Sequence, residues 1–167
     1  MNTAEAHPEI EAFWEVAKRR AKLANLPGYF GPSALESLVP PAWSFGDSAE
    51  LADELLALVL DGRKTATSSA LWDYEAEDEE LPEPGNLSIV LDGAGIPRAL
   101  IVVTAVEHLS FAEVSEEQAR AEGEGDLSLA HWRAEHERFF REAATHDRGF
   151  SPEMPVVFET FEVLYQS

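Results

Sequence analysis

A lysine and two threonines follow shortly after the longest aliphatic run of the chain, residues 55–60. Lys64 stands where this helix-like segment ends, and Thr65 and Thr67 come directly after it. Partial burial at such a place disfavours the charged ammonium, and a neutral amine can activate a threonine hydroxyl for nucleophilic attack. The same residues also fit a cation near a helix C-terminus followed by β-forming threonines. On residue type alone, both interpretations stay open.

Other common catalytic arrangements are missing from the sequence. The absence of cysteine excludes disulfides, thiolate metal sites and a cysteine nucleophile. His131, Glu135 and His136 suggest a zinc site. Only His131 and Glu135 share a helix face, however, so the pair of histidines on one face that binds zinc in zincin proteases is absent. No Gly-x-Ser-x-Gly turn exists, and Ser128 before His131 fits a helix N-cap. Because no phosphate-binding glycine loop is present either, we expect neither a metal nor another cofactor.

The charge balance restricts the partners. The chain has 12 lysines and arginines against 32 aspartates and glutamates, a formal net charge of −20 at pH 7. Proteins that coat nucleic acid need the opposite balance, so long duplex nucleic acid is excluded as a partner. Residues 73–83 hold seven acidic side chains and no basic one, which predicts a mobile surface loop. Arg63, Lys64 and Arg98 still suffice for one or two phosphates, because nearby charges dominate within a Debye length of about 8 Å.

The ends and apolar runs predict where the protein works. The first residues include Glu5, Glu9 and Glu11 and lack the basic start and apolar stretch of a secretory signal. Crossing a bilayer takes about 20 apolar residues, far more than the run at 55–60 offers. We therefore expect a cytoplasmic protein with no membrane partner. The sequence contains no signal for a particular oligomeric state.

Helical periodicity and capping residues predict the elements that position Lys64. An amphipathic helix is expected over residues 8–25, then a loop-rich connection with a short helix at 34–38. A second helix is expected over 47–62, from its capping-box-like start and its final glycine. We divide the chain into an N-terminal helix and connection, residues 1–42, packed on a domain of residues 43–167.

The remaining segments alternate between strand and helix signals. We expect strands at residues 65–70, 87–91, 96–106 and 156–165, and helices at 115–123 and 127–142. An Asp-Gly turn joins the second and third of these strands as a hairpin. This mixture predicts an α+β fold in which a small, mostly antiparallel β-barrel is surrounded by helices.

The motif Gly62-x-Lys64-x-x-Thr67 belongs to a longer pattern. Its other parts are Ser44-Phe45-Gly46-Asp47, then Phe111 and Val114, and Ala119-x-x-Glu122-Gly123-Glu124-Gly125-Asp126-x-Ser128-Leu129-x-x-Trp132. From about Trp43 to Tyr165 the chain resembles the ASCH domain family, in its larger bacterial branch. The resemblance implies a PUA-like β-barrel decorated by helices, a cleft beside the signature and an RNA-related role. Some members remove the acyl group from N4-acetylcytidine, and cleavage of single-stranded RNA occurs in the superfamily.

The resemblance also implies roles for three residues. By motif position, Lys64 is the base, Thr67 the nucleophile and Glu122 the acid or electrostatic partner. Side chains on a regular strand alternate between faces, so Lys64 and Thr67 share the cleft only if Lys64 lies in the turn or a bulge intervenes. If neither holds, Thr65 is the better nucleophile.

Aromatic and basic residues near the signature suggest how a ligand is bound. Trp72 and Tyr74 offer rings on which a base can stack, for about 1–3 kcal/mol each. Arg63, Thr65 and Arg98 complete the expected binding set. The predicted ligand is a modified nucleoside or a short single-stranded RNA, and the predicted activity is amide hydrolysis of the nucleoside. The alternatives are single-stranded RNA binding or ribonuclease activity, and a non-catalytic nucleoside-sensing module.

Overall fold

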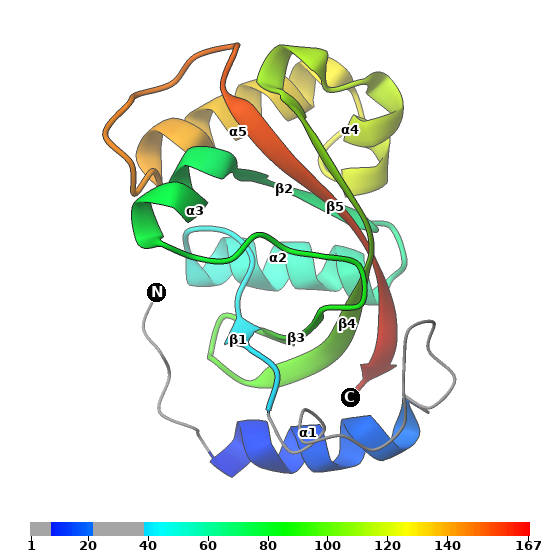
Figure 1. Ribbon diagram of the computed structural model, residues 1–167. Helices are drawn as coiled ribbons and strands as arrows, with labels where there is room; N and C mark the ends of the chain where they lie inside the picture. The colour runs from blue at the N-terminus through cyan, green and yellow to red at the C-terminus, as the bar shows by residue number, and fades with distance from the viewer. Residues whose placement is uncertain (1–7, 22–38) are drawn as a thin grey trace. The chain divides into compact units, whose positions relative to one another are not determined.

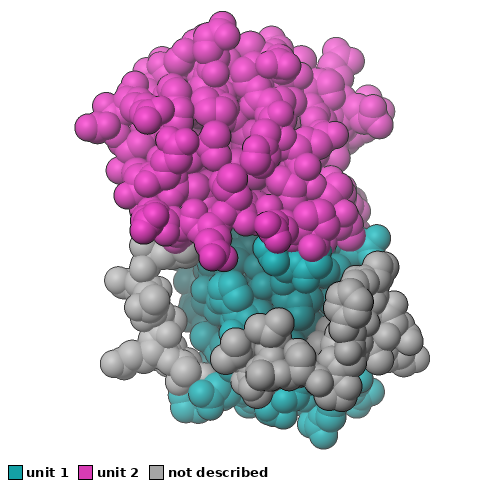
Figure 2. Space-filling view, viewed as in Figure 1, with its two compact units in different colours: residues 1–60, 85–102, 162–167 teal, residues 61–84, 103–161 magenta. Residues whose placement is uncertain are grey.

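The computed structural model describes residues 8–21 and 39–167. The chain forms two compact units, which Figure 2 colours separately. Unit 1 consists of residues 1–60, 85–102 and 162–167, and unit 2 of residues 61–84 and 103–161. The short helix expected at 34–38 and the end of the first expected helix lie outside the described residues.

Unit 1 is built around an amphipathic helix and a β-hairpin. Its elements are α1 (Pro8–Arg20), β1 (Ala42–Trp43), α2 (Ala49–Leu60), β3 (Leu87–Leu91), the start of β4 (Pro97–Ser110) and the end of β5 (Pro155–Gln166). The buried face of α1 packs against Ile89 and Leu100, as its apolar spacing predicts. α2 begins after Ser48, whose Oγ accepts a hydrogen bond from the Leu51 amide at 3.1 Å. Ser48 therefore caps this helix in place of the expected Asp47.

Unit 2 holds the signature segment. Its own elements are β2 (Ala66–Ala70), α3 (Leu71–Glu77), the short 3-10 helix η3 (Phe111–Glu113), α4 (Glu116–Glu122) and α5 (Leu129–Glu142). α4 starts with a capping box between Ser115 and Gln118 and ends at Gly123, in the left-handed conformation that closes many helices. Ser128 caps α5 through the amide of His131, as expected from the sequence. α4 and α5 lie beside each other (Figure 1).

The sheet is open. Its strand order is β1-β3-β4-β5-β2, with β1 and β3 parallel and the β3–β4 and β2–β5 pairs antiparallel. Closing a barrel would require the two outer strands to pair, but β1 has two residues and pairs with β3, and β2 has five and pairs with β5. The expected α+β class is confirmed, whereas the expected closed β-barrel is wrong.

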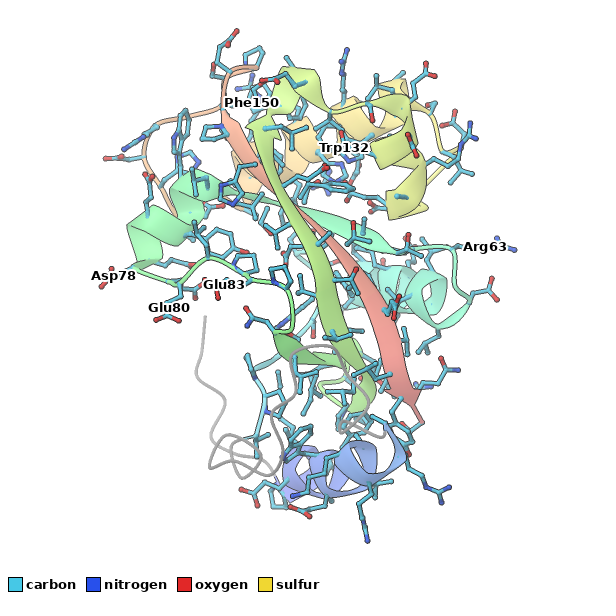
Figure 3. The ribbon with its side chains drawn as sticks, turned by 45° about the vertical axis from the view of Figure 1, so that its right-hand side comes forward. Arg63, Asp78, Glu80, Glu83, Trp132 and Phe150 are labelled. Carbon is cyan, nitrogen blue, oxygen red and sulfur yellow. The ribbon has the colours of Figure 1, made fainter. Side chains whose placement is uncertain are left out.

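The acidic segment is only partly a loop. Residues 71–77 form α3, which ends at Asp78 with a positive φ of 52°. Trp72 and Tyr74 are half-buried and fix this helix, an effect that the count of acidic residues concealed. Asp78, Glu80 and Glu83 are exposed (Figure 3), so the predicted loop is correct only for the later part of 73–83.

No helix among residues 8–21 and 39–167 has the length and apolar character needed to cross a membrane.

Candidate functional site

Lys64 lies in the turn before β2 and is almost completely buried. Gly62 precedes it with φ at +78°, a conformation that glycine adopts without steric cost. The Lys64 side chain is 2% exposed, and its Nζ donates to the backbone oxygen of Ala66 at 2.9 Å. The same Nζ lies 3.6 Å from Glu122 Oε1 and 3.5 Å from Glu124 Oε2. The lysine therefore links the start of β2 to Glu122, at the end of α4, and to Glu124 just after it.

Glu122, at the end of α4, is the centre of this cluster. One carboxylate oxygen accepts from Ser68 Oγ at 2.7 Å and from the indole nitrogen of Trp132, and the other lies 3.0 Å from His136 Nε2. Burial pushes the pKa of Glu122 upward, but the Lys64 charge and the hydrogen bonds of His136 and Trp132 outweigh burial and lower it to about 2. Glu122 is therefore an ionised hydrogen-bond acceptor at neutral pH, and a weak base.

His136 closes the cluster from α5. Its ring stacks on Trp132 with centroids 4.2 Å apart, and its Nδ1 lies 2.8 Å from the Trp132 carbonyl oxygen. Burial lowers the pKa of His136, but the hydrogen bond and charge of Glu122 and the charge of Glu124 give a net rise. This residue belonged to the zinc hypothesis of the sequence, and here it contacts Glu122 instead.

Within the described part of the chain, one group has the spacing to hold a metal ion: Glu122, Glu124 and His136 offer ligand atoms within 4.8 Å of one another. Lys64 places its ammonium beside both carboxylates. The ammonium therefore compensates part of the carboxylate charge that a cation would otherwise neutralise.

The two faces of β2 separate the predicted catalytic residues. Ala66, Ser68 and Ala70 are buried, and Thr67 and Ser69 alternate with them on the half-buried face. Ser68 points to Glu122, so Thr67 lies on the opposite face from the buried cluster. Lys64 does belong to the turn, as the resemblance required, yet it reaches the cluster on the Ser68 side.

The other predicted hydroxyl, Thr65, is exposed and attached to α4. Its Oγ1 donates to the carbonyl oxygen of Ala121 at 3.1 Å, and its backbone amide donates to the same oxygen at 2.8 Å. The Thr65 hydroxyl therefore helps to attach the segment before β2 to α4.

Gly123 makes this junction very tight. It has φ at +71°, and a Cβ there would lie 2.3 Å from the backbone oxygen of Arg63. No side chain fits between the end of α4 and the turn that carries Lys64.

The predicted binding residues belong to both units. Arg63 is exposed (Figure 3), and its Nε pairs with Asp61 at 2.9 Å. Arg98 belongs to unit 1, where it pairs with Asp92 at 3.7 Å and donates from Nε to the Ser167 carbonyl oxygen at 3.3 Å. The Arg98 side chain therefore interacts with the β3–β4 hairpin and with the last residue of the chain.

Trp72 and Tyr74 both come from α3, directly after β2. Trp72 lines a cavity of about 420 Å³, together with His146 and Arg148. The Arg148 guanidinium lies 5.1 Å from the Trp72 ring centroid and the His146 ring 5.3 Å from it, so this indole already has two partners. Tyr74 is half-buried and hydrogen-bonded to Ser69.

Sequence reasoning missed Ser68, Glu124 and His136 as members of the cluster. Strand alternation carried a signal for Ser68, because Ala66 is a buried residue two positions earlier. For His136 the signal was its place four residues after Trp132, on the same side of α5. Trp132 (Figure 3), the last residue of the family pattern, is buried and donates a hydrogen bond to Glu122.

Comparisons with known proteins agree with this fold. The sequence model of the ASCH domain family matches residues 41–165. Protein EF3133 from Enterococcus faecalis V583 is 39% identical; the match covers 93% of this chain and 87% of that chain, with a TM-score of 0.78. An ASCH domain from Lactobacillus crispatus JV V101 is 27% identical over 99% of this chain and 100% of that chain, also with a TM-score of 0.78. Among curated proteins, none matches. The chain therefore belongs to the ASCH domain family.

Proposed function

We propose that this protein binds a modified nucleoside derived from RNA and hydrolyses the amide on its base, with N4-acetylcytidine as the representative substrate. Thr67 provides the nucleophilic hydroxyl. Lys64 and Glu122 hold the strand that presents it.

The observation that carries the proposal is the link from the buried cluster to the strand. Lys64 Nζ donates to the carbonyl oxygen of Ala66, the residue directly before Thr67. Glu122 holds Lys64 from the other side and accepts from Ser68, the residue directly after Thr67. Both backbone neighbours of Thr67 are therefore fixed, which is the pre-organisation that a nucleophile needs.

This arrangement gives Lys64 a positioning role. The resemblance implies that Lys64 is the base, but its side chain is 2% exposed, so a ligand does not reach it without opening the cluster. Lys64 instead fixes the start of the strand that carries Thr67, through its hydrogen bond to the Ala66 carbonyl oxygen. Misplacing a nucleophile by about 1 Å costs on the order of 100-fold in rate, so a positioning lysine is sensitive to substitution.

The charge of unit 2 favours an uncharged ligand over a strand of RNA. Residues 73–83 follow β2 and carry seven acidic side chains. The exposed cation beside Lys64 is Arg63, which is paired with Asp61. Binding a polyanion needs a continuous basic track, whereas a nucleoside without phosphate needs hydrogen bonds and a stacking surface.

The first prediction concerns turnover. Wild-type protein should release cytidine from N4-acetylcytidine, measured by chromatography. Thr67→Ala should reduce kcat/KM by about 1000-fold or more, because the nucleophile is lost, while Thr67→Ser should keep measurable activity. Lys64→Ala should lower kcat by about 100-fold through misplaced Thr67.

The matched controls are Lys18→Ala, a partly exposed lysine of α1, and Thr104→Ala, an exposed threonine of β4. Both should act as wild type. Absence of cytidine release by wild-type protein, or equal release by Thr67→Ala, would reject the proposed hydrolysis.

A second candidate function is non-catalytic nucleoside sensing. The near-complete burial of Lys64 and Glu122 favours it, because groups that are closed off from solvent do not take part in a reaction with a bound ligand. In that case N4-acetylcytidine would raise the melting temperature in proportion to the logarithm of its concentration, with no product formed.

A further inference from the structure

A glutamate lies beside Thr67 on the half-buried face of the sheet. In the antiparallel pair of β2 and β5, Thr67 is directly opposite Glu159. Directly opposite residues have their Cβ atoms about 4.5–5.5 Å apart and point to the same face. Both side chains are partly exposed, in contrast to Ser68 on the other face. A hydroxyl and a carboxyl are therefore neighbours where a ligand has access.

Burial dominates the surroundings of Glu159. Burial alone raises the pKa of its carboxyl to about 7, since no described cation or donor offsets the loss of water. Among the described residues, Tyr74 of α3 is a titratable neighbour of Glu159 and is itself influenced by Glu79 and Glu77, while β2 contributes the hydroxyls of Thr67 and Ser69. Burial and the negative charge of Glu159 raise the pKa of Tyr74 to about 12, although Ser69 opposes this shift, so Tyr74 keeps its proton.

We infer that Glu159 is the general acid–base residue of this site and that the ligand's amide is attacked on the face of β2 and β5 that carries Thr67, Glu159 and Tyr74. This inference rests on the proposed function. It moves the reaction from the closed Lys64–Glu122 cluster to the opposite face of the same strand. The substrate class is a neutral amide on an aromatic heterocycle, which Tyr74 and the carboxyl of Glu159 can recognise by hydrogen bonds.

The chemistry balances with water as the only co-reactant. The Glu159 carboxylate takes the proton of Thr67 Oγ as this oxygen forms a bond to the acyl carbon. The C–N bond then breaks, and Glu159 gives the proton to the departing nitrogen, leaving the free base and an acyl ester on Thr67. Water attacks the ester and loses a proton to Glu159, which returns it to Thr67 Oγ as the carboxylic acid leaves.

Glu122 does not meet these requirements. It is 1% exposed, and its oxygens are bound by Ser68, Trp132 and His136. A group that is ionised down to about pH 2 accepts a proton poorly at neutral pH, whereas an acid–base residue works best near the operating pH. Glu159 differs from Glu122 in its access and its capacity to hold a proton, and no hydrogen bond from another described residue lowers its pKa.

The test combines a pH profile with direct observation of the carboxyl. Glu159→Gln should lower kcat/KM for N4-acetylcytidine by about 100-fold or more and remove the ionisation near pH 7 from the wild-type profile. A glutamine of the same size keeps the packing, so circular dichroism should be unchanged. The matched control is Glu162→Gln, an exposed glutamate on the same strand, which should retain the wild-type rate and profile.

The outcomes separate this inference from the proposed function. An active wild type with an unaltered Glu159→Gln variant would overturn the inference and leave the hydrolysis intact. An inactive wild type rejects the hydrolysis, and the face is then tested by NMR of protein labelled with ¹³C at glutamate carboxyl groups. A shift of the Glu159 signal on addition of N4-acetylcytidine, absent for Glu162, would support this face as the ligand site. No shift would overturn it.

Discussion

The ionisation of Glu122 connects this one side chain to stability. Its pKa falls from 4.5 to about 2 in the folded protein, although burial alone would raise it. A lowered pKa stabilises the fold above pH 4.5, and this contribution is lost as pH falls through about 2. Removing one partner of a buried ion pair costs about 3–5 kcal/mol. Glu122→Gln should therefore reduce the free energy of unfolding by this order at pH 7.

Urea unfolding at pH 7, 5 and 3 measures this effect. The difference between wild type and Glu122→Gln should be similar at pH 7 and 5 and smaller at pH 3, because below pH 4.5 the unfolded chain binds a proton that folded Glu122 does not. Glu137→Gln, which removes an exposed partner of Arg141, should change the free energy of unfolding by less than about 1 kcal/mol. A constant difference at all three pH values would mean that Glu122 acts through packing alone.

At the scale of elements, the contact of α4 with the turn before β2 makes a second stability prediction. Gly123 and Gly62 both have positive φ, at +71° and +78°, so alanine at either position is strained by about 1–2 kcal/mol. Only at Gly123 does a Cβ also meet backbone, 2.3 Å from the Arg63 oxygen, whereas nothing lies within 4 Å at Gly62. Gly123→Ala should be the more destabilising change in thermal unfolding and should separate Lys64 from Glu122. Equal losses of stability at the two positions would show that the backbone around Arg63 can move away from an added Cβ at no energetic cost.

Elements with local signals were predictable from the sequence, and those that depend on distant partners were not. The capping box at Ser115 and the cap at Ser128 depend on neighbouring residues, so α4 begins within one residue of the expected start and α5 begins at Leu129, two residues after it. The open sheet was missed because strand pairing is decided over long separations, as in the pairing of Ala66 with Thr160. The helix at 71–77 was missed because acidic composition outweighed two aromatic residues.

The candidate site shows the same division. Lys64 and Glu122 were chosen by resemblance to a family, and the structure brings them within 3.6 Å. Which hydroxyl meets the carboxylate depends on the face that β2 buries, and the sequence left this open. Burial of Ala66 fixes the alternation, so Ser68 faces Glu122 and Thr67 faces Glu159.

For the whole molecule, the net charge of −20 makes a prediction about partners. A fluorescent single-stranded oligouridine should not bind measurably at 0.15 M salt in an anisotropy titration, because few cations are available to replace phosphate counterions. The affinity for N4-acetylcytidine should be almost independent of salt, since the ligand is neutral. Tight oligouridine binding that weakens steeply with salt would contradict both expectations and favour the RNA-binding alternative.

β2 presents Ser68 to Glu122 on one face and Thr67 to Glu159 on the other, and this restricts insertions and deletions in the strand. Removing or adding a single residue between Lys64 and Ser68 would rotate the rest of the strand by half a turn, exchanging the side chains presented to Glu122 and Glu159. The exposed stretch after α3 makes no such demand, because extra residues there only lengthen a connection. Natural variants of this protein should therefore tolerate insertions near Glu80 but no insertion between Lys64 and Ser68.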